Sequence, residues 1–148
     1  HRTGLARVAP GAAGRAEKVG RLVAEKGWAL VCGGLGGIME AACRGARDAG
    51  GLTVGILPGV NSHEANPYVD VPVVTGVGHA RNLFIVYTAR AVIALPGGAG
   101  TMSEVALSLK TATPVVGLDA WGDIEGVIAA SSPEDAVEKA ISAASGRR

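Results

Sequence analysis

The residues at positions 96–104, Pro-Gly-Gly-Ala-Gly-Thr-Met-Ser-Glu, have the types and spacing best suited to bind an anion. Gly97, Gly98 and Gly100 leave the backbone free to wrap around a phosphate group. The N–H groups of a following helix and the Thr101 hydroxyl would then supply hydrogen-bond donors, assisted by the helix dipole. Because backbone amides can do this work, such a site needs no lysine. The sequence therefore predicts a phosphate-bearing ligand bound by these four residues.

Glu104 in this segment has two interpretations. It follows Thr101 by three residues, which is the spacing of a capping box, and the spacing alone favours a carboxylate that caps its own helix. The alternative is a carboxylate directed at the sugar of the ligand, where it would act as a base or as a hydrogen-bond acceptor.

A second glycine-rich loop, Gly-Gly-Leu-Gly-Gly, occupies positions 33–37. It is neither a Walker A loop nor a GxGxxG loop, because no Gly-Lys-Ser/Thr follows and Met39 stands where the third glycine belongs. Gly34, Gly36 and Gly37 could bring the backbone close to a phosphate or sugar. A tight turn between a strand and a helix explains the same residues equally well.

Arg81 opens a mostly apolar segment at positions 83–87. The helix dipole disfavours an arginine at a helix start, so this side chain needs an anion or a carboxylate as its partner. That makes it a candidate phosphate clamp, with a surface arginine as the even alternative. The polar loop at positions 58–68 either closes over a ligand or is a solvated connection, and its His63-Glu64 pair lacks the further ligands of a metal site.

The elements that must position these residues alternate between strands and helices. Short apolar runs that end in turn residues predict strands, with a weaker strand where Pro72 indicates an edge. The predicted strands cover residues 28–32, 52–57, 71–74, 91–95 and 114–118, with the poorest at 5–9, and helices are predicted over 15–26, 38–49, 101–110 and from Ser132-Pro133 onward. This alternation predicts an α/β fold: one Rossmann-like domain over residues 1–148, with a doubly wound, mostly parallel sheet and helices on both faces. Ligands of such folds bind outside the carboxyl ends of the strands, where both glycine-rich loops fall.

The composition of the chain limits the kinds of partner that we expect. The net charge is +1, from 14 basic and 13 acidic residues without a basic stripe, so no nucleic-acid partner is expected. No apolar run approaches a membrane span and no signal peptide opens the chain, so we expect a cytoplasmic protein without a membrane partner. Cys32 and Cys43 lack CxxC spacing, which argues against a zinc site and a disulfide framework.

The motif Pro-Gly-Gly-x-Gly-Thr-x-x-Glu, with an arginine-bearing segment and a Gly-Gly-x-Gly-Gly loop before it, resembles the LONELY GUY and molybdenum-cofactor-carrier-like group. The resemblance covers nearly the whole chain, from about residue 20 to residue 118. In the enzyme branch of the group the turn binds the 5′-phosphate of a nucleotide, and an arginine and the motif glutamate support cleavage of the N-glycosidic bond. The resemblance implies Arg81 and Glu104 as that catalytic pair.

Two departures argue against the enzyme branch, whereas the stretches at positions 33–42, 64–68 and 78–82 resemble the carrier-like branch. Asn82 follows Arg81 where the hydrolases have lysine, and Ala99 and Ser103 stand where they have an aromatic residue and a second glutamate. The carrier-like branch holds the phosphate of a pterin cofactor in the same pocket without breaking it. The resemblance therefore implies a binding protein for a phosphorylated, nucleotide-like ligand, with a nucleoside 5′-monophosphate phosphoribohydrolase as the alternative, and leaves open whether the protein is an enzyme.

The resemblance also bears on cofactors and partners. It implies that no cofactor is required and that a nucleotide monophosphate or molybdenum cofactor would be the bound ligand. Members of the group pair through helices, which implies a homo-oligomer.

Overall fold

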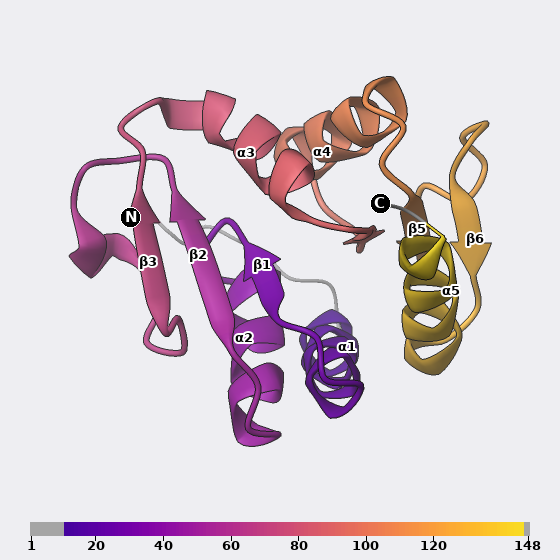
Figure 1. The fold of residues 1–148 in the computed structure, drawn as a ribbon, viewed down its shortest axis with the longest axis horizontal. Helices are drawn as coiled ribbons and strands as arrows, with labels where there is room; N and C mark the ends of the chain where they lie inside the picture. Colours follow the sequence, from indigo (N-terminus) through magenta and orange to yellow (C-terminus); the bar gives the residue numbers. More distant parts are fainter. Residues whose placement is uncertain (1–10, 147–148) are drawn as a thin grey trace. The chain divides into compact units, whose positions relative to one another are not determined.

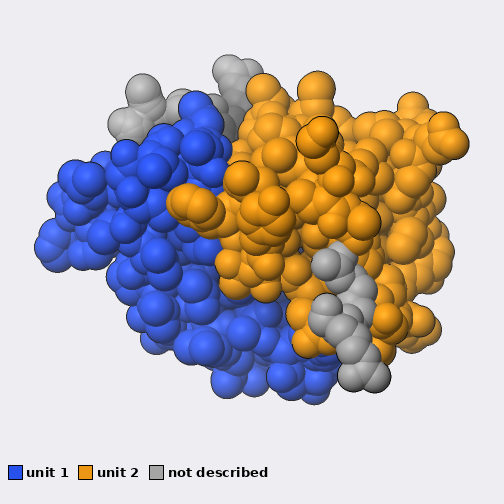
Figure 2. Space-filling view, turned by 45° about the horizontal axis from the view of Figure 1, so that its top comes forward, with its two compact units in different colours: residues 1–81 blue, residues 82–148 orange. Residues whose placement is uncertain are grey.

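The computed structural model describes residues 11–146, which fall into two compact units with a division after Arg81. Figure 1 shows the helices and strands, and Figure 2 colours the two units separately. The predicted α/β fold class is confirmed, since helices alternate with strands and all strand pairs described are parallel. The strand predicted over residues 5–9 lies outside the described residues.

The first unit is built around a parallel sheet of order β1-β2-β3. Its elements are α1 (Ala12–Glu25), β1 (Leu30–Cys32), α2 (Ile38–Asp48), β2 (Thr53–Leu57) and β3 (Val71–Val74), with short 3-10 turns at Ser62–Glu64 and Gly78–Ala80. The ladder aligns Leu30 with Thr53 and Val54 with Val71. All four residues of β3 are exposed, which agrees with the edge position that Pro72 predicts.

Helices α1 and α2 lie side by side (Figure 1), and two glycines form their closest contacts. A side chain at Gly20 would collide with the carbonyl oxygen of Ala42, and one at Gly45 would collide with the carbonyl oxygen of Glu17. The two backbones therefore approach closely at both points, and glycine is required there for packing. Both helices also contact β1, the strand that precedes the first glycine-rich loop.

The second unit contains a parallel sheet of order β4-β5-β6. Its elements are α3 (Arg81–Thr88), which starts at the last residue of the first unit, then β4 (Val92–Ala94), α4 (Ala99–Lys110), β5 (Val115–Leu118), β6 (Ile128–Ala130) and α5 (Pro133–Ser145). Val92, Ala94, Val105 and Val115 form the centre of its core. As predicted, Ser132 caps α5, with its hydroxyl accepting from the Asp135 N–H at 3.0 Å.

Strand β6 is the element of this unit that the sequence did not predict. It has three residues, none of them buried, so it lacks the apolar run that marks β4 and β5. Across residues 11–146, no helix is long and apolar enough to cross a membrane.

Candidate functional site

The glycine-rich turn of the second unit connects the end of β4 to the start of α4. The helix begins at Ala99 after an N-cap residue, Gly98, that has no side chain to cap it. The first helical hydrogen bond runs from the Met102 N–H to the Gly98 carbonyl at 3.0 Å. The amides of residues 99–101 consequently have no helical carbonyl to bind, which is the arrangement that attracts an anion.

The three glycines of this turn are glycine for two different reasons. A side chain at Gly97 would collide with the Thr101 hydroxyl, so Thr101 lies over the Gly97 backbone. A Cβ at Gly98 or at Gly100 would meet no atom within 4 Å, and both residues are exposed. Packing within the chain explains Gly97, whereas the bare surface at Gly98 and Gly100 is open to a ligand.

Glu104 does not form the capping box that its spacing favours. A capping box requires Thr101 at the N-cap, but α4 starts two residues earlier, so Thr101 is its third residue and Glu104 lies in its second turn. The sequence interpretation was wrong because the low helix propensity of glycine indicates a start after Gly100, whereas the helix includes this residue. Glu104 is half-buried.

Asn82 and Ser103 form a hydrogen-bond network beside the turn. The Asn82 side-chain amide donates to the Ser103 hydroxyl at 2.8 Å and to the Gly100 carbonyl at 3.4 Å. The Ser103 hydroxyl donates to the same Gly100 carbonyl at 2.8 Å. Asn82 is only 4% exposed, so a buried side chain of α3 contacts the first turn of α4 directly.

Trp121, which the sequence did not single out, supports the other end of the turn. The Trp121 indole N–H donates to the carbonyl oxygen of Leu95 at 2.9 Å, just before Pro96. Trp121 and Asp119 have left-handed backbone conformations, with φ of 68° and 67°, which non-glycine residues seldom adopt. The loop after β5 thereby places the indole against the end of β4. An aromatic residue in a loop gave no sequence signal for this contact.

The first unit holds the Gly33–Gly37 loop, where chain geometry explains two of the three predicted site residues. Gly34 has φ of 77°, and a Cβ there would lie 2.7 Å from Leu57 Cδ2. Gly37, the N-cap of α2, has φ of 68°. Gly36 is exposed, and a Cβ there would have only the Glu40 carboxylate nearby, at 3.9 Å. Turn formation therefore accounts for Gly34 and Gly37, and Gly36 alone leaves open space.

Arg81 is buried, with 7% of its surface exposed, so its interpretation as a surface arginine was wrong. Its Nη1 donates to the carbonyl oxygen of Ile56 at 3.1 Å. A side chain at Gly33 would collide with the same nitrogen, so the guanidinium lies against the Gly33 backbone. The charge of Arg81 is thus held at the carboxyl ends of β1 and β2, the edge where such folds bind ligands.

Two free thiols lie beneath the loop of the first unit. The Cys32 and Cys43 sulfur atoms are 3.4 Å apart, and the Gly34 N–H donates to Cys32 Sγ at 3.3 Å. The hydrogen bond to Cys43, together with burial, raises the pKa of Cys32, and the same hydrogen bond lowers the pKa of Cys43. One thiol of the pair therefore donates a hydrogen bond to the other.

The polar loop at residues 58–68 ends in a buried residue that anchors it. Asn66 is 7% exposed; its N–H donates to the Gly34 carbonyl at 2.8 Å, and its side chain donates to the Leu35 carbonyl at 2.9 Å. These hydrogen bonds join the polar loop to the Gly33–Gly37 loop at this end, whereas His63 and Glu64 of the polar loop are exposed. Residues 11–146 contain no group of three or more His, Cys, Asp or Glu side chains able to hold a metal ion.

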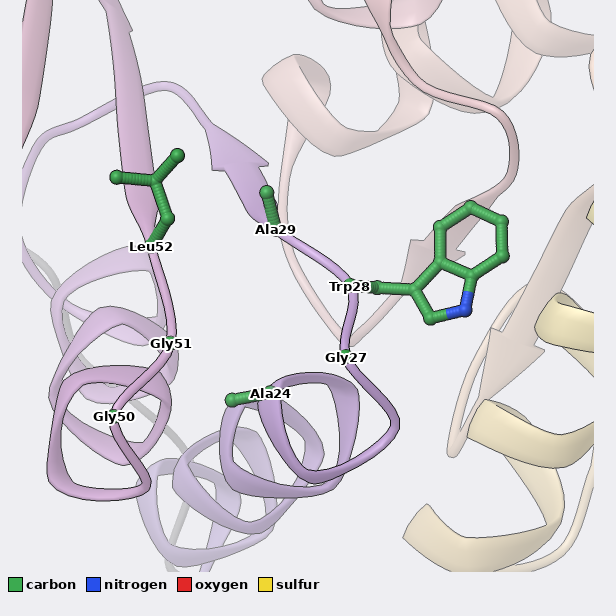
Figure 3. A pocket seen from close by; sticks show the side chains of 7 residues that line it. All are labelled: Ala24, Gly27, Trp28, Ala29, Gly50, Gly51 and Leu52. Atoms are coloured by element: carbon green, nitrogen blue, oxygen red, sulfur yellow. The ribbon is translucent and has the colours of Figure 1, made fainter.

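A hollow of about 320 Å³ lies at the other end of the strands of the first unit (Figure 3). Its lining comes from the residues that precede β1 and β2, together with Ala24 of α1. Gly27, Gly50 and Gly51 contribute backbone, and Trp28 and Leu52 contribute the larger side chains. It lacks a charged side chain and lies before β1 and β2, whereas the Gly33–Gly37 loop follows β1, so we assign it no part in the candidate site.

Parallel strands followed by glycine-rich turns at helix N-termini define a class, the Rossmann-like α/β proteins. Within this class, the chain belongs to the SLOG cluster4 family, whose model matches residues 4–146. It is 46% identical over 127 residues to a protein of Archaeoglobus fulgidus without an assigned function, covering 86% of this chain and 83% of that protein.

Two similar proteins have described functions. A solved structure of the molybdenum cofactor binding protein from Rippkaea orientalis is 41% identical, with a TM-score of 0.87 over 92% of this chain and 90% of that one. The cytokinin riboside 5′-monophosphate phosphoribohydrolase of Mycobacterium marinum is 38% identical over 120 residues, 74% of this chain. The chain spans 63% of that enzyme's length. The resemblance inferred from the motif residues is confirmed.

Proposed function

We propose that this protein binds a phosphorylated, nucleotide-like ligand at residues 96–104, with molybdenum cofactor as the leading candidate. The observation that carries the proposal is the start of α4, which has an uncapped N-cap glycine and open space above Gly98 and Gly100. A phosphate there would accept from the amides of residues 99–101 and from the Thr101 hydroxyl. Similarity to a molybdenum cofactor binding protein over nearly the whole chain supports this choice of ligand.

The alternative function is cleavage of the N-glycosidic bond of a nucleoside 5′-monophosphate. One observation favours keeping it: the similarity to the phosphoribohydrolase of Mycobacterium marinum. In this reaction water adds to the anomeric carbon as the bond to the base breaks, giving free base and ribose 5-phosphate. A carboxylate such as Glu104 would stabilise the oxocarbenium-like transition state, with Arg81 as the predicted second catalytic residue.

One experiment separates the two functions. The purified protein is incubated with AMP; binding is measured by calorimetry and free adenine by chromatography. Saturable binding without adenine release supports the binding protein, whereas steady release that Glu104→Gln abolishes supports the enzyme and refutes the binding-only function. Absence of binding to AMP, to inorganic phosphate and to molybdenum cofactor would refute both.

Three further properties belong to this proposal. We propose one domain over residues 1–148, which similarity to a solved protein over 92% of the chain supports. We propose a cytoplasmic protein, and a homo-oligomer that uses the exposed apolar side chains Phe84, Tyr87 and Met102, which are 43%, 67% and 55% exposed. Light scattering on the wild type and on Tyr87→Lys tests the oligomer, since a charge in that surface should dissociate it.

A further inference from the structure

Asn82 is the buried polar residue that directly contacts the first turn of α4. With 4% of its surface exposed, it has lost nearly all contact with water, and its amide donates to Ser103 Oγ at 2.8 Å and to the Gly100 carbonyl at 3.4 Å. Burying an amide costs free energy unless its hydrogen bonds are made. Any movement of Ser103 or Gly100 that breaks these bonds is therefore unfavourable, and both partners are held in position.

Ser103 is the partner that turns this contact into a closed network. Its hydroxyl donates to the Gly100 carbonyl at 2.8 Å while accepting from Asn82. The Gly100 carbonyl, which lies in the first turn of the helix, therefore accepts hydrogen bonds from two side chains. Gly100 is the helix residue that most needs such support, because glycine costs about 1 kcal/mol relative to alanine inside a helix.

We infer that Asn82 and Ser103 are positioning residues that keep the first turn of α4 formed before the ligand arrives. This inference rests on the proposed function, since it concerns the same turn. Gly98 and Gly100 give the ligand room, but glycines also make the turn flexible when it is empty. The network restores order by holding the Gly100 carbonyl, so the turn loses less conformational freedom when the anion binds.

The test measures both the empty and the liganded turn. In Asn82→Ala and Ser103→Ala without ligand, we expect the amide hydrogens of residues 102–104, which bond within the first turn, to exchange about fivefold faster, the effect of losing one net hydrogen bond. Affinity for AMP and for inorganic phosphate should fall by a similar factor of about five. The double variant should be little worse than either single variant, because both changes remove one network.

Two matched variants make the outcome specific. Ser103→Thr keeps the hydroxyl and should retain wild-type affinity. Ser145→Ala removes a comparable bond, from the Ser145 hydroxyl to the Ile141 carbonyl at 2.8 Å in α5, and should leave affinity and exchange at residues 102–104 unchanged. Ser103 is more exposed than Asn82, so Ser103→Ala carries the test if Asn82→Ala fails to fold.

Unchanged exchange and unchanged affinity in Ser103→Ala would overturn the inference while leaving the proposed function intact. If the wild type binds none of the ligands, the proposed function fails. In that case the exchange measurement still decides whether the network orders the turn.

Discussion

The substitution Gly98→Val tests most directly whether the amides at the start of α4 bind the phosphate. In the protein without ligand, a Cβ at this position meets no atom within 4 Å, and the φ of Gly98 is −98°. Valine is a poorer N-cap residue than glycine, so we expect a loss of about 1 kcal/mol in the free energy of unfolding. For a chain of this size that corresponds to a fall of about 2–4 °C in Tm.

The effect on binding should be much larger than the effect on stability. The isopropyl group would occupy the space through which a phosphate reaches the amides of residues 99–101. Each hydrogen bond to a charged group contributes about 1.5–3 kcal/mol, so the loss of two costs about 3–6 kcal/mol. Since about 1.4 kcal/mol corresponds to a factor of ten, affinity for AMP should fall at least about a hundredfold.

Titration calorimetry with AMP and with inorganic phosphate measures this loss, and circular dichroism confirms that the variant is folded. The matched control is Gly14→Val in α1, where a Cβ likewise meets nothing within 4 Å and the residue is exposed. It should leave both affinities unchanged. A folded Gly98→Val that binds AMP within about threefold of the wild type would refute the assignment of the phosphate to this turn.

Three other perturbations follow from contacts in the structure. Trp121→Phe keeps the ring packing but removes the N–H that binds the Leu95 carbonyl at 2.9 Å, so urea unfolding should show a loss of about 1 kcal/mol; an unchanged midpoint would contradict the supporting role of the indole. Cys43→Ala removes the hydrogen bond that raises the pKa of Cys32, so thiolate absorbance should show Cys32 ionising at lower pH than in the wild type. The Ser131 N–H and then Lys139 hold the pKa of Asp135 below its usual 3.8, so its stabilising effect is complete above that pH and is lost as the pH falls through the lowered value. Acid unfolding of Asp135→Asn should therefore depend less steeply on pH, and a slope equal to that of the wild type would count against this role.

Most of the elements could be predicted from sequence because their signals are local. The apolar runs before Gly33, Pro58 and Pro96 became β1, β2 and β4, since a buried parallel strand needs only a short apolar run ended by a turn residue. The same reasoning missed β6, whose three residues are not buried and whose place depends on pairing with β5.

The candidate site was less predictable because its determinants lie far apart in sequence. Asn82 and Ser103 are separated by 21 residues, and their contact depends on how α3 and α4 pack. Burial of Arg81 against Gly33 depends likewise on the tertiary structure, whereas the sequence alone balanced a surface arginine against a clamp. Spacing also misled where Thr101 and Glu104 matched a capping box, because α4 starts at Ala99 despite its glycine.

Some glycines of the two loops pack against other atoms of the chain, and others face open space. Only the second kind indicates where a ligand binds. Gly33, Gly34 and Gly97 would each bring a side chain into contact with other atoms of the chain, so their identity is explained without any ligand. No such contact explains Gly98 or Gly100, and a glycine inside a helix costs stability unless something else requires it. Bare backbone at a helix start has a physical use when an anion must reach the amides, and this is why the binding proposal depends on these two residues and not on the number of glycines in the motif.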